Sequence, residues 1–339
     1  MAHVIDQVDR LGPGGVLRGA RVMVTGGAGF IGGHLVTRLL GAGAHINVID
    51  DLSTGHAENL RDALHVGLTE ADVHVCDIRT RAASELIKRW RPHVLVHLAA
   101  QTSVPAAAQS PLRDADVNIR GTVNILDACV EAGVGHVVYA ASSAVYGQVT
   151  GDLLPVREGM TIAPVGPYGL SKATALHYLN WYRSSRELPY TALILGNVYG
   201  PRRAGDDAGV VAQMAGAILL GRRPVIFGDG RQTRDFVFVH DVVDAAVLAC
   251  ATSGIGTVNI ASGVETSVAE VLRLIGDAGC LSIHPQYEPA PPGDVRRMVL
   301  DIGRAGRALG WRPATAIADG VAAVLRAQWR SLHAEVVAP

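Results

Sequence analysis

The chain has 339 residues, of which 49% are apolar, and a formal net charge of -1. This length is enough for one large α/β domain and a smaller lobe, and the apolar fraction is enough for a large core. The near-zero charge gives no electrostatic basis for binding nucleic acid or an anionic membrane, so neither is an expected partner.

The cysteines and the N-terminal segment indicate the cellular compartment in which the protein is expected. Cys76, Cys129, Cys250 and Cys280 are far apart, which argues against a disulfide framework and against any metal site, and which fits a reducing cytoplasm. Residues 1–20 contain prolines, glycines and charges without a continuous apolar run. We therefore expect a poorly ordered extension there, and neither a signal peptide nor a membrane span.

The first chemical signal is a glycine-rich turn. An apolar run at 22–24 suits a buried parallel strand, and Gly26, Gly29 and Gly32 follow it. Glycines at this spacing permit a tight turn and close approach of backbone N–H groups to a pyrophosphate. The helix expected at 30–40, beginning with Phe30 and Ile31, points its positive end at the phosphates.

A second strand, expected at 45–49, ends in Asp50, whose carboxylate would accept the hydroxyls of a ribose. Asp51 and Leu52 follow, and no arginine stands there to hold a 2′-phosphate. The sequence therefore favours NAD over NADP as the cofactor.

Strands and helices then alternate. Strands are expected at 73–76, 94–97 and 137–140, and helices at 81–90 and 111–130. This order predicts a Rossmann-type, doubly wound parallel sheet with ligands beyond the carboxyl ends of its strands.

Residues at two of these strand ends are candidates for contact with the cofactor. Asp77 and Ile78 would hold and cover an adenine ring, and the small segment Leu98, Ala99 and Ala100 would let the backbone approach the second ribose.

Beyond residue 174 the pattern becomes shorter and less regular. We expect the NAD-binding domain at 21–174, a mainly substrate-binding α/β lobe at 175–332 and a tail at 333–339, with strands near 190–196 and 236–240 returning to the main domain. Within residues 175–332 the elements are shorter. Helices are expected at 209–220, 241–250, 268–277 and 317–330, and strands at 225–227, 258–260 and 283–287.

Tyr168 and Lys172 stand four residues apart in a helix expected at 167–186, so their side chains share one face. An ammonium group nearby lowers the pKa of a phenol from its usual value of about 10, which makes an acid–base pair. Tyr168 would remove a proton from a sugar hydroxyl while NAD accepts hydride from the carbon, and Ser142, after the fifth strand, would share that proton.

At this point the sequence resembles the NAD-dependent epimerase/dehydratase family of extended short-chain dehydrogenase/reductases, and within it most the UDP-glucose 4-epimerases. The resemblance covers about residues 21–330. Its motifs lie at 25–32, Asp50, 77–78, 97–100, 142–147, 168–172, 197–201, 228–235, 292–297 and 309–311.

The resemblance implies roles for individual residues. Ser142, Tyr168 and Lys172 would be the catalytic trio. The uridine diphosphate would be held by Asn197, Arg234 and Arg297, because arginine forks match diphosphate oxygens. Arg296 is the alternative to Arg297. The residues implied near the sugar are Gln101, Ser142, Ser143, Tyr199 and Arg202.

The two residues after Ser142 reduce the number of reactions that fit this site. Related dehydratases usually carry Asp-Glu at the next two places and related decarboxylases a glutamate at the second, whereas this chain has Ser143 and Ala144, which supply no further acid or base. Reversible oxidation at C4 through a 4-keto sugar remains, with NAD retained. The expected activity is 4-epimerisation of UDP-glucose and UDP-galactose.

Other interpretations stay open. A uronate epimerase needs groups for a carboxylate: Pro105 stands where one such arginine is sought, whereas Arg202 and Arg203 favour that substrate. The segment 202–207 is one residue shorter than the usual epimerase loop, and an N-acetylated sugar is a further alternative. A non-catalytic NAD-binding module is the rival of another class. The family commonly pairs through a four-helix bundle, so a homodimer through helices at 112–130 and 167–186 is expected.

Overall fold

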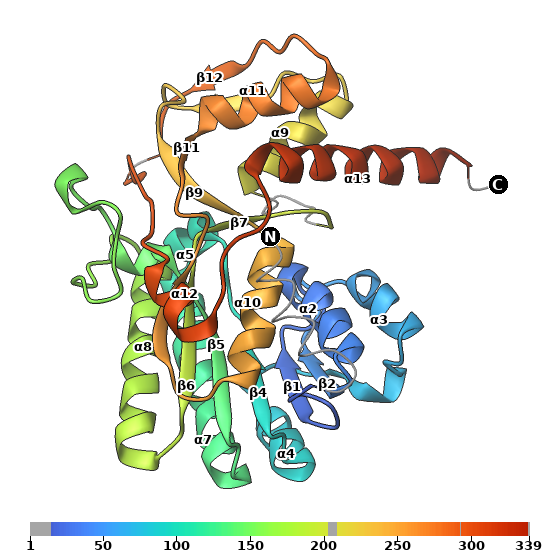
Figure 1. The fold of residues 1–339 in the computed structure, drawn as a ribbon, viewed down its shortest axis with the longest axis vertical. Coiled ribbons are helices and arrows are strands. Elements are labelled where there is room, and N and C mark those ends of the chain that lie inside the picture. The colour runs from blue at the N-terminus through green and yellow to red at the C-terminus, as the bar shows by residue number, and fades with distance from the viewer. Residues whose placement is uncertain (1–14, 203–208, 292, 338–339) are drawn as a thin grey trace.

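The strands of the first half build one sheet, and a smaller lobe lies beyond one end of it (Figure 1). The computed structural model describes residues 15–202, 209–291 and 293–337. All neighbouring strands of the large sheet run parallel. Across the sheet their order is β10 (Gly256–Ile260), β6 (Tyr190–Leu195), β5 (His136–Ser142), β4 (Val94–His97), β1 (Arg21–Thr25), β2 (His45–Asp50) and β3 (Val73–Val75).

Helices cover both faces, because a parallel sheet must bury both. Along β1, Val22 and Val24 pack into one core cluster and Met23 into the other. The first cluster includes residues of α2 (Phe30–Gly41), α3 (Arg61–His65), α10 (Val239–Ala251) and α12 (Gly303–Leu309). The second includes residues of α4 (Arg81–Trp90), α7 (Thr122–Ala132) and α8 (Pro167–Arg186). The doubly wound Rossmann-type fold expected from the sequence is confirmed.

The direction of winding reverses between β1 and β4. Thr25, the last residue of β1, pairs with Ile49 on one side and with His97 on the other. In open α/β sheets the crevice beyond such a point is where ligands bind. The functional side chains are therefore sought at the carboxyl ends of β1, β2, β4 and β5.

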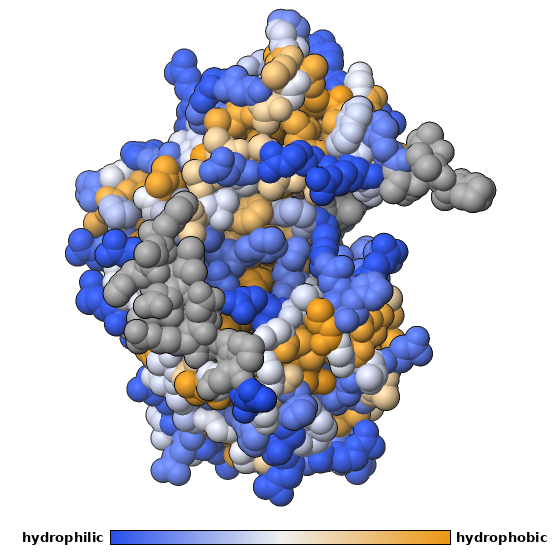
Figure 2. Space-filling view, turned by 45° about the vertical axis from the view of Figure 1, so that its right-hand side comes forward, coloured by the Kyte–Doolittle hydropathy of each residue, from blue (hydrophilic) through white to orange (hydrophobic). Residues whose placement is uncertain are grey.

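The lobe has its own core. A three-stranded sheet holds β11 (Glu265–Ser267), β9 (Thr233–Phe238) and β7 (Asn197–Tyr199), and a two-stranded sheet holds β12 (Gln286–Glu288) and β8 (Val225–Phe227). Residues of α9 (Gly209–Leu219), α11 (Val268–Gly279) and α13 (Ile317–Val337) complete the third apolar cluster. In Figure 2 the outline of the molecule is indented between this lobe and the larger domain.

Three expectations about segments are wrong. Residues 236–240 add no strand to the large sheet: β9 pairs with β7 and β11, and β10 occupies the sheet edge next to β6. Leu17 is only 2% exposed and packs in the core, so the expected poorly ordered extension does not include residues 15–20, whereas residues 1–14 lie outside the described residues. The last helix continues to Val337 and leaves no tail at 333.

The helix expected at 111–130 is not uniform. It consists of α6 (Pro111–Ala115), a π-helical segment at Asp116–Gly121 and α7. The hydrogen bonds of a π segment span one residue more than those of an α-helix, and such segments occur frequently at functional sites. No helix among the described residues is long and apolar enough to cross a membrane.

Candidate active site

The glycine turn after β1 lies directly against the end of β4. Gly26 has a φ of +72°, which L side chains rarely adopt, and a Cβ there would lie 2.6 Å from the backbone nitrogen of Ala99. A Cβ on Gly32 would collide with Gly26 O. The turn therefore requires glycine for its own packing as well as for an approaching ligand.

The N-terminus of α2 is open to an anion. Gly29, its N-cap, is extended and no side chain caps the helix, and its first turn carries no acidic residue. The first N–H groups of a helix have no partner inside the helix, so they suit a phosphate. Phe30 and Ile31 are half-buried beside them. This cradle fits the pyrophosphate of a dinucleotide.

Asp50 is 6% exposed at the end of β2. Its Oδ2 accepts the Ala28 N–H at 2.9 Å and its Oδ1 accepts the Leu52 N–H at 2.9 Å. Burial raises the pKa of this carboxyl, and the two N–H groups oppose that effect. A carboxylate held in this way keeps lone pairs for the two hydroxyls of a ribose. Asp51 is exposed next to it.

Asp77 and Ile78 have structural partners of their own. The Asp77 carboxylate pairs with Arg79 at 2.5 Å, and this hydrogen bonding lowers the pKa of Asp77. Ile78 is 5% exposed and belongs to the core, where a Cβ on Gly121 would lie 2.7 Å from its Cδ1. The contact of Ile78 with an adenine ring stays a prediction, as does that of Asp77.

Lys172 lies on α8 with its side chain buried against β5. Its Nζ donates to Ala140 O at 3.0 Å and is 4.9 Å from the centroid of the Tyr139 ring. Burial lowers the pKa of Lys172 to about 8, and the charge of Asp114 opposes this effect. An ammonium in this place is positioned to stabilise a phenolate on Tyr168, one turn earlier and half-buried.

Ser142 is brought to the start of the same helix. It ends β5, and its Oγ accepts the Ala144 N–H at 3.2 Å. A Cβ on Gly169, which follows Tyr168, would lie 2.6 Å from Ala144 O. The turn after Ser142 and the first turn of α8 are therefore in direct backbone contact, as an acid–base trio requires.

Gln101 and Tyr199 are placed differently from what a sugar contact needs. The side-chain amide of Gln101 donates to Asp114 Oδ1 at 2.9 Å and to Ser103 O at 3.0 Å, and its Oε1 accepts the Ser103 N–H. Tyr199 is 4% exposed in the lobe core, where its hydroxyl donates to Ile317 O at 3.4 Å. Both side chains are thus occupied within the protein.

Ser143 and Asn197 differ in exposure. Ser143 is 8% exposed in the turn after β5, whereas Asn197 is exposed at the start of β7. Of these two, Asn197 is the side chain that a ligand can reach directly.

The arginines expected at the diphosphate are all held by carboxylates. Arg234 pairs with Asp294 and also donates to Val295 O at 2.5 Å. Arg297 makes two hydrogen bonds of 2.6 Å to Glu265, so it is oriented by a fork-to-fork pair.

Arg296 and Arg202 are paired as well. Arg296 makes two hydrogen bonds, of 2.7 and 2.9 Å, to Asp229. Arg202 pairs with Asp62 of α3. Arg203 and the shortened segment after Arg202 fall within 203–208, which lies outside the described residues.

Sequence reasoning missed a polar network beneath the site. His97, 1% exposed, contacts Thr25 Oγ1 at 2.7 Å and Thr122 Oγ1 at 3.1 Å, and burial lowers the pKa of His97 to about 3. The amide of Asn118 binds both the N–H and the C=O of Gln101, at 2.8 and 2.9 Å. Asp114, Asn118 and Thr122 recur every four residues on one buried helix face, a signal that the sequence contains.

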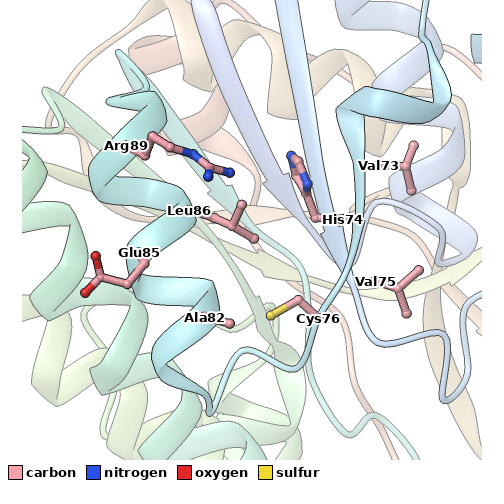
Figure 3. Close-up of a pocket in the computed structure, with 8 residues that line it drawn as sticks. All are labelled: Val73, His74, Val75, Cys76, Ala82, Glu85, Leu86 and Arg89. Atoms are coloured by element: carbon pink, nitrogen blue, oxygen red, sulfur yellow. The ribbon is translucent and has the colours of Figure 1, made fainter.

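A surface hollow at the outer edge of the sheet is separate from this site. It is lined by β3 and α4, and Figure 3 shows His74 and Cys76 across from Leu86 and Arg89. No expected catalytic or binding residue lines it. The candidate active site is therefore the crevice at the strand ends, not this hollow.

A glycine cradle before a helix N-terminus, an acidic residue after the second strand and a buried lysine one turn from a tyrosine together define an NAD-binding α/β enzyme of the dehydrogenase type. Residues 22–261 match the NAD dependent epimerase/dehydratase family. The chain belongs to this family.

Similar proteins are known by sequence and by structure. The chain is 43% identical over 308 residues to a UDP-glucose 4-epimerase of Mycolicibacterium smegmatis, covering 89% of this chain and 96% of that protein. It superposes on the UDP-glucose 4-epimerase of Thermotoga maritima, solved with UDP-glucose, with a TM-score of 0.87, 34% identity and coverage of 92% and 99%.

A more distant structural neighbour has another substrate. It is the UDP-glucuronic acid 4-epimerase of Bacillus cereus, solved with UDP-glucuronic acid and NAD, with a TM-score of 0.84, 26% identity and coverage of 92% and 99%.

Proposed function

We propose that the protein is an NAD-dependent UDP-hexose 4-epimerase that interconverts UDP-glucose and UDP-galactose. The observation that carries this proposal is the buried Lys172 one helical turn after Tyr168, with Ser142 at the same corner. A protein that only senses NAD has no use for an ammonium buried beside a tyrosine.

The chain's own residues divide the work. The turn at Gly26–Gly32 and Asp50 would hold NAD, which when bound supplies the acceptor and donor for the hydrogen on C4. The ammonium of Lys172 would stabilise the phenolate form of Tyr168, and Tyr168 would remove the proton from the 4-hydroxyl and return it after the 4-keto sugar has turned over. Ser142 donates a hydrogen bond to the same oxygen. Neither Ser143 nor Ala144 adds an acid or a base, so water elimination is not supported.

The choice of sugar rests on the relatives. The relative with 43% identity and the neighbour solved with UDP-glucose are both named UDP-glucose 4-epimerases. Arg202, the residue that most favoured a uronate, is paired with Asp62. The arginines expected at the diphosphate are paired with carboxylates in the same way, so this pairing does not distinguish a uronate from a neutral hexose.

Two parts of the proposal concern the assembly and the compartment. Leu170, Tyr178 and Trp181 form an exposed stripe along α8, 58%, 38% and 47% exposed. Such a stripe suits a second copy of the chain, so we propose a homodimer through α8 and the helix formed by α6 and α7. Four free cysteines fit a reducing cytoplasm.

The test uses purified protein without added cofactor, incubated separately with UDP-glucose, UDP-glucuronate and UDP-N-acetylglucosamine, with the products resolved by NMR. Conversion of UDP-glucose is expected, with NAD retained from expression. Conversion of the uronate alone would keep the mechanism and replace the substrate. No turnover even with NAD supplied would favour another nucleotide sugar or the non-catalytic module.

Light scattering on the same sample tests the dimer. A monomer at working concentration would contradict it.

A further inference from the structure

Asp114 is a buried carboxylate without a cationic partner among the described side chains. It is 1% exposed, and its Oδ1 accepts hydrogen bonds from Gln101 Nε2 at 2.9 Å and Asn118 Nδ2 at 3.1 Å. Its Oδ2 is buried and has no hydrogen-bond partner in the described part of the chain. Burial of a carboxyl group with one oxygen unpartnered is unfavourable, so Asp114 is not explained by stability.

Hydrogen bonds connect Asp114 to the catalytic helix. Asn118 Nδ2 also donates to Ser171 Oγ at 3.1 Å, and Ser171 Oγ donates to Tyr168 O at 3.0 Å. Helix α6, which carries Asp114, packs against α8. One carboxylate oxygen is thus joined, through Asn118 and Ser171, to the turn of α8 that holds both Tyr168 and Lys172.

The groups that face Lys172 leave Asp114 as the source of negative charge. Tyr139 of β5 lies under the ammonium, and burial raises the pKa of its phenol, so that it stays neutral. His97 of β4 is neutral because burial lowers its pKa to about 3. Tyr168, on the same helix, carries charge only as the phenolate. Asp114 opposes the effect of burial on Lys172.

We propose that Asp114 is a positioning residue of the active site. One carboxylate oxygen fixes Gln101 and Asn118, and through Asn118 and Ser171 it orients the turn of α8 that carries Tyr168 and Lys172, with the buried carboxylate close to that turn. The catalytic meaning of this inference rests on the proposed function, whereas the effect of Asp114 on Lys172 is a property of the folded chain.

Because the chain contains two lysines, Lys88 and Lys172, the effect of Asp114 on the titration of Lys172 can be measured directly. Protein labelled with ¹³Cε-lysine gives two signals, assigned with Lys88→Arg. Asp114→Asn keeps the shape and the acceptor for Gln101 and Asn118 but removes the charge. We expect the titration midpoint of Lys172 to fall by roughly half to one pH unit in this variant. Lys88, which pairs with Glu131 at 2.5 Å on the surface, is the internal control and keeps its midpoint.

Two more variants separate charge from structure. Asp114→Glu keeps the charge and should hold the Lys172 midpoint close to that of the wild type. Asn118→Ala breaks the hydrogen-bonded link but leaves the charge, so it should lower kcat without moving the midpoint. If both lysine signals of Asp114→Asn lie at random-coil positions, that variant is unfolded. Asp114→Ser is then used in its place.

An unchanged Lys172 midpoint in a folded Asp114→Asn protein would overturn the proposal, and so would an equal shift in Asn118→Ala. In the wild type and Asp114→Asn, the pH at which kcat/KM for UDP-glucose falls on the alkaline side should move with the midpoint. If the wild type converts no UDP-hexose, the proposed function fails, and the lysine titration still decides the role of Asp114.

Discussion

The surroundings of Lys172 and the arginines of the lobe differ in how their charges are held. Lys172 is 3% exposed and is held by a backbone carbonyl, an aromatic ring and the field of one buried carboxylate. Arg296 and Arg297 lie at the surface, each in a two-bond pair with a carboxylate. Lys172 is thus already in place, whereas under the proposed function a diphosphate would have to displace Asp229 or Glu265 before Arg296 or Arg297 could hold it.

This difference has a physical reason. A charged side chain that shifts the pKa of a neighbouring group does so most strongly in an environment of low dielectric constant, so it is buried and fixed. A charge that must capture a ligand needs access to solvent, and a carboxylate keeps its side chain oriented until the ligand arrives. The variants below test this contrast.

The largest effect is expected at Tyr168, one turn before the buried Lys172. Tyr168→Phe removes the hydroxyl that is proposed to transfer the proton, and kcat for UDP-glucose should fall about 100- to 10,000-fold with little change in KM. The measurement is steady-state turnover by NMR. Tyr178→Phe, on the exposed side of the same helix, is the control and should keep wild-type turnover; unimpaired turnover in Tyr168→Phe would refute the mechanism.

At the lobe, Arg297→Gln should act on binding. We expect KM for UDP-glucose to rise about 10- to 100-fold with a smaller change in kcat, because the proposed two-pronged contact with the diphosphate would be lost. Arg296→Gln is the matched variant, since its arginine is similarly exposed and paired. A larger KM effect in Arg296→Gln would assign the diphosphate contact to Arg296.

The cofactor cradle gives a third comparison. In Gly26→Ala the new Cβ meets the Ala99 backbone at 2.6 Å in a left-handed conformation. NAD should bind about tenfold more weakly or worse, and the free energy of unfolding should fall by about 1–3 kcal/mol. Gly41→Ala, whose Cβ would meet nothing within 4 Å, should retain both values; calorimetry and NAD titration measure them.

The buried ammonium also predicts a dependence of stability on pH. The pKa of Lys172 is about 8 in the folded protein and about 10.4 in an unfolded chain, so between these values the unfolded state binds more protons. This group therefore favours folding more as pH rises. Urea unfolding should show the stability advantage of Lys172→Met over the wild type shrinking by on the order of 1–2 kcal/mol from pH 7.5 to 9.5. A constant difference would mean that Lys172 does not titrate there.

The smallest effect concerns the carboxylate that pairs with Arg297. Glu265→Gln keeps an acceptor for Thr233 but removes the charge that competes with a diphosphate. KM for UDP-glucose should fall about two- to fivefold, roughly the size of an exposed ion pair. A rise in KM would indicate that Glu265 holds Arg297 in the binding geometry rather than away from it.

The sequence by itself determined the elements that depend on local pattern. The strand–turn–helix at Gly26–Gly32 was predictable because only glycine tolerates that geometry, and the parallel sheet followed from the alternation of strands and helices. The position of Tyr168 and Lys172 one turn apart on one helix was predictable from their four-residue spacing. The family was predictable because its motifs occur in order along nearly the whole chain.

Only the tertiary structure decided which side chains already have partners. Gln101 and Tyr199 have the chemistry of sugar ligands, yet packing turns the first to Asp114 and the second into the lobe core. The strand at Thr233–Phe238 joins the lobe and not the large sheet, because partners distant in the chain set strand pairing. Asp114 gained its importance in the same way: its charge matters only because the fold buries it beside the helix of Lys172.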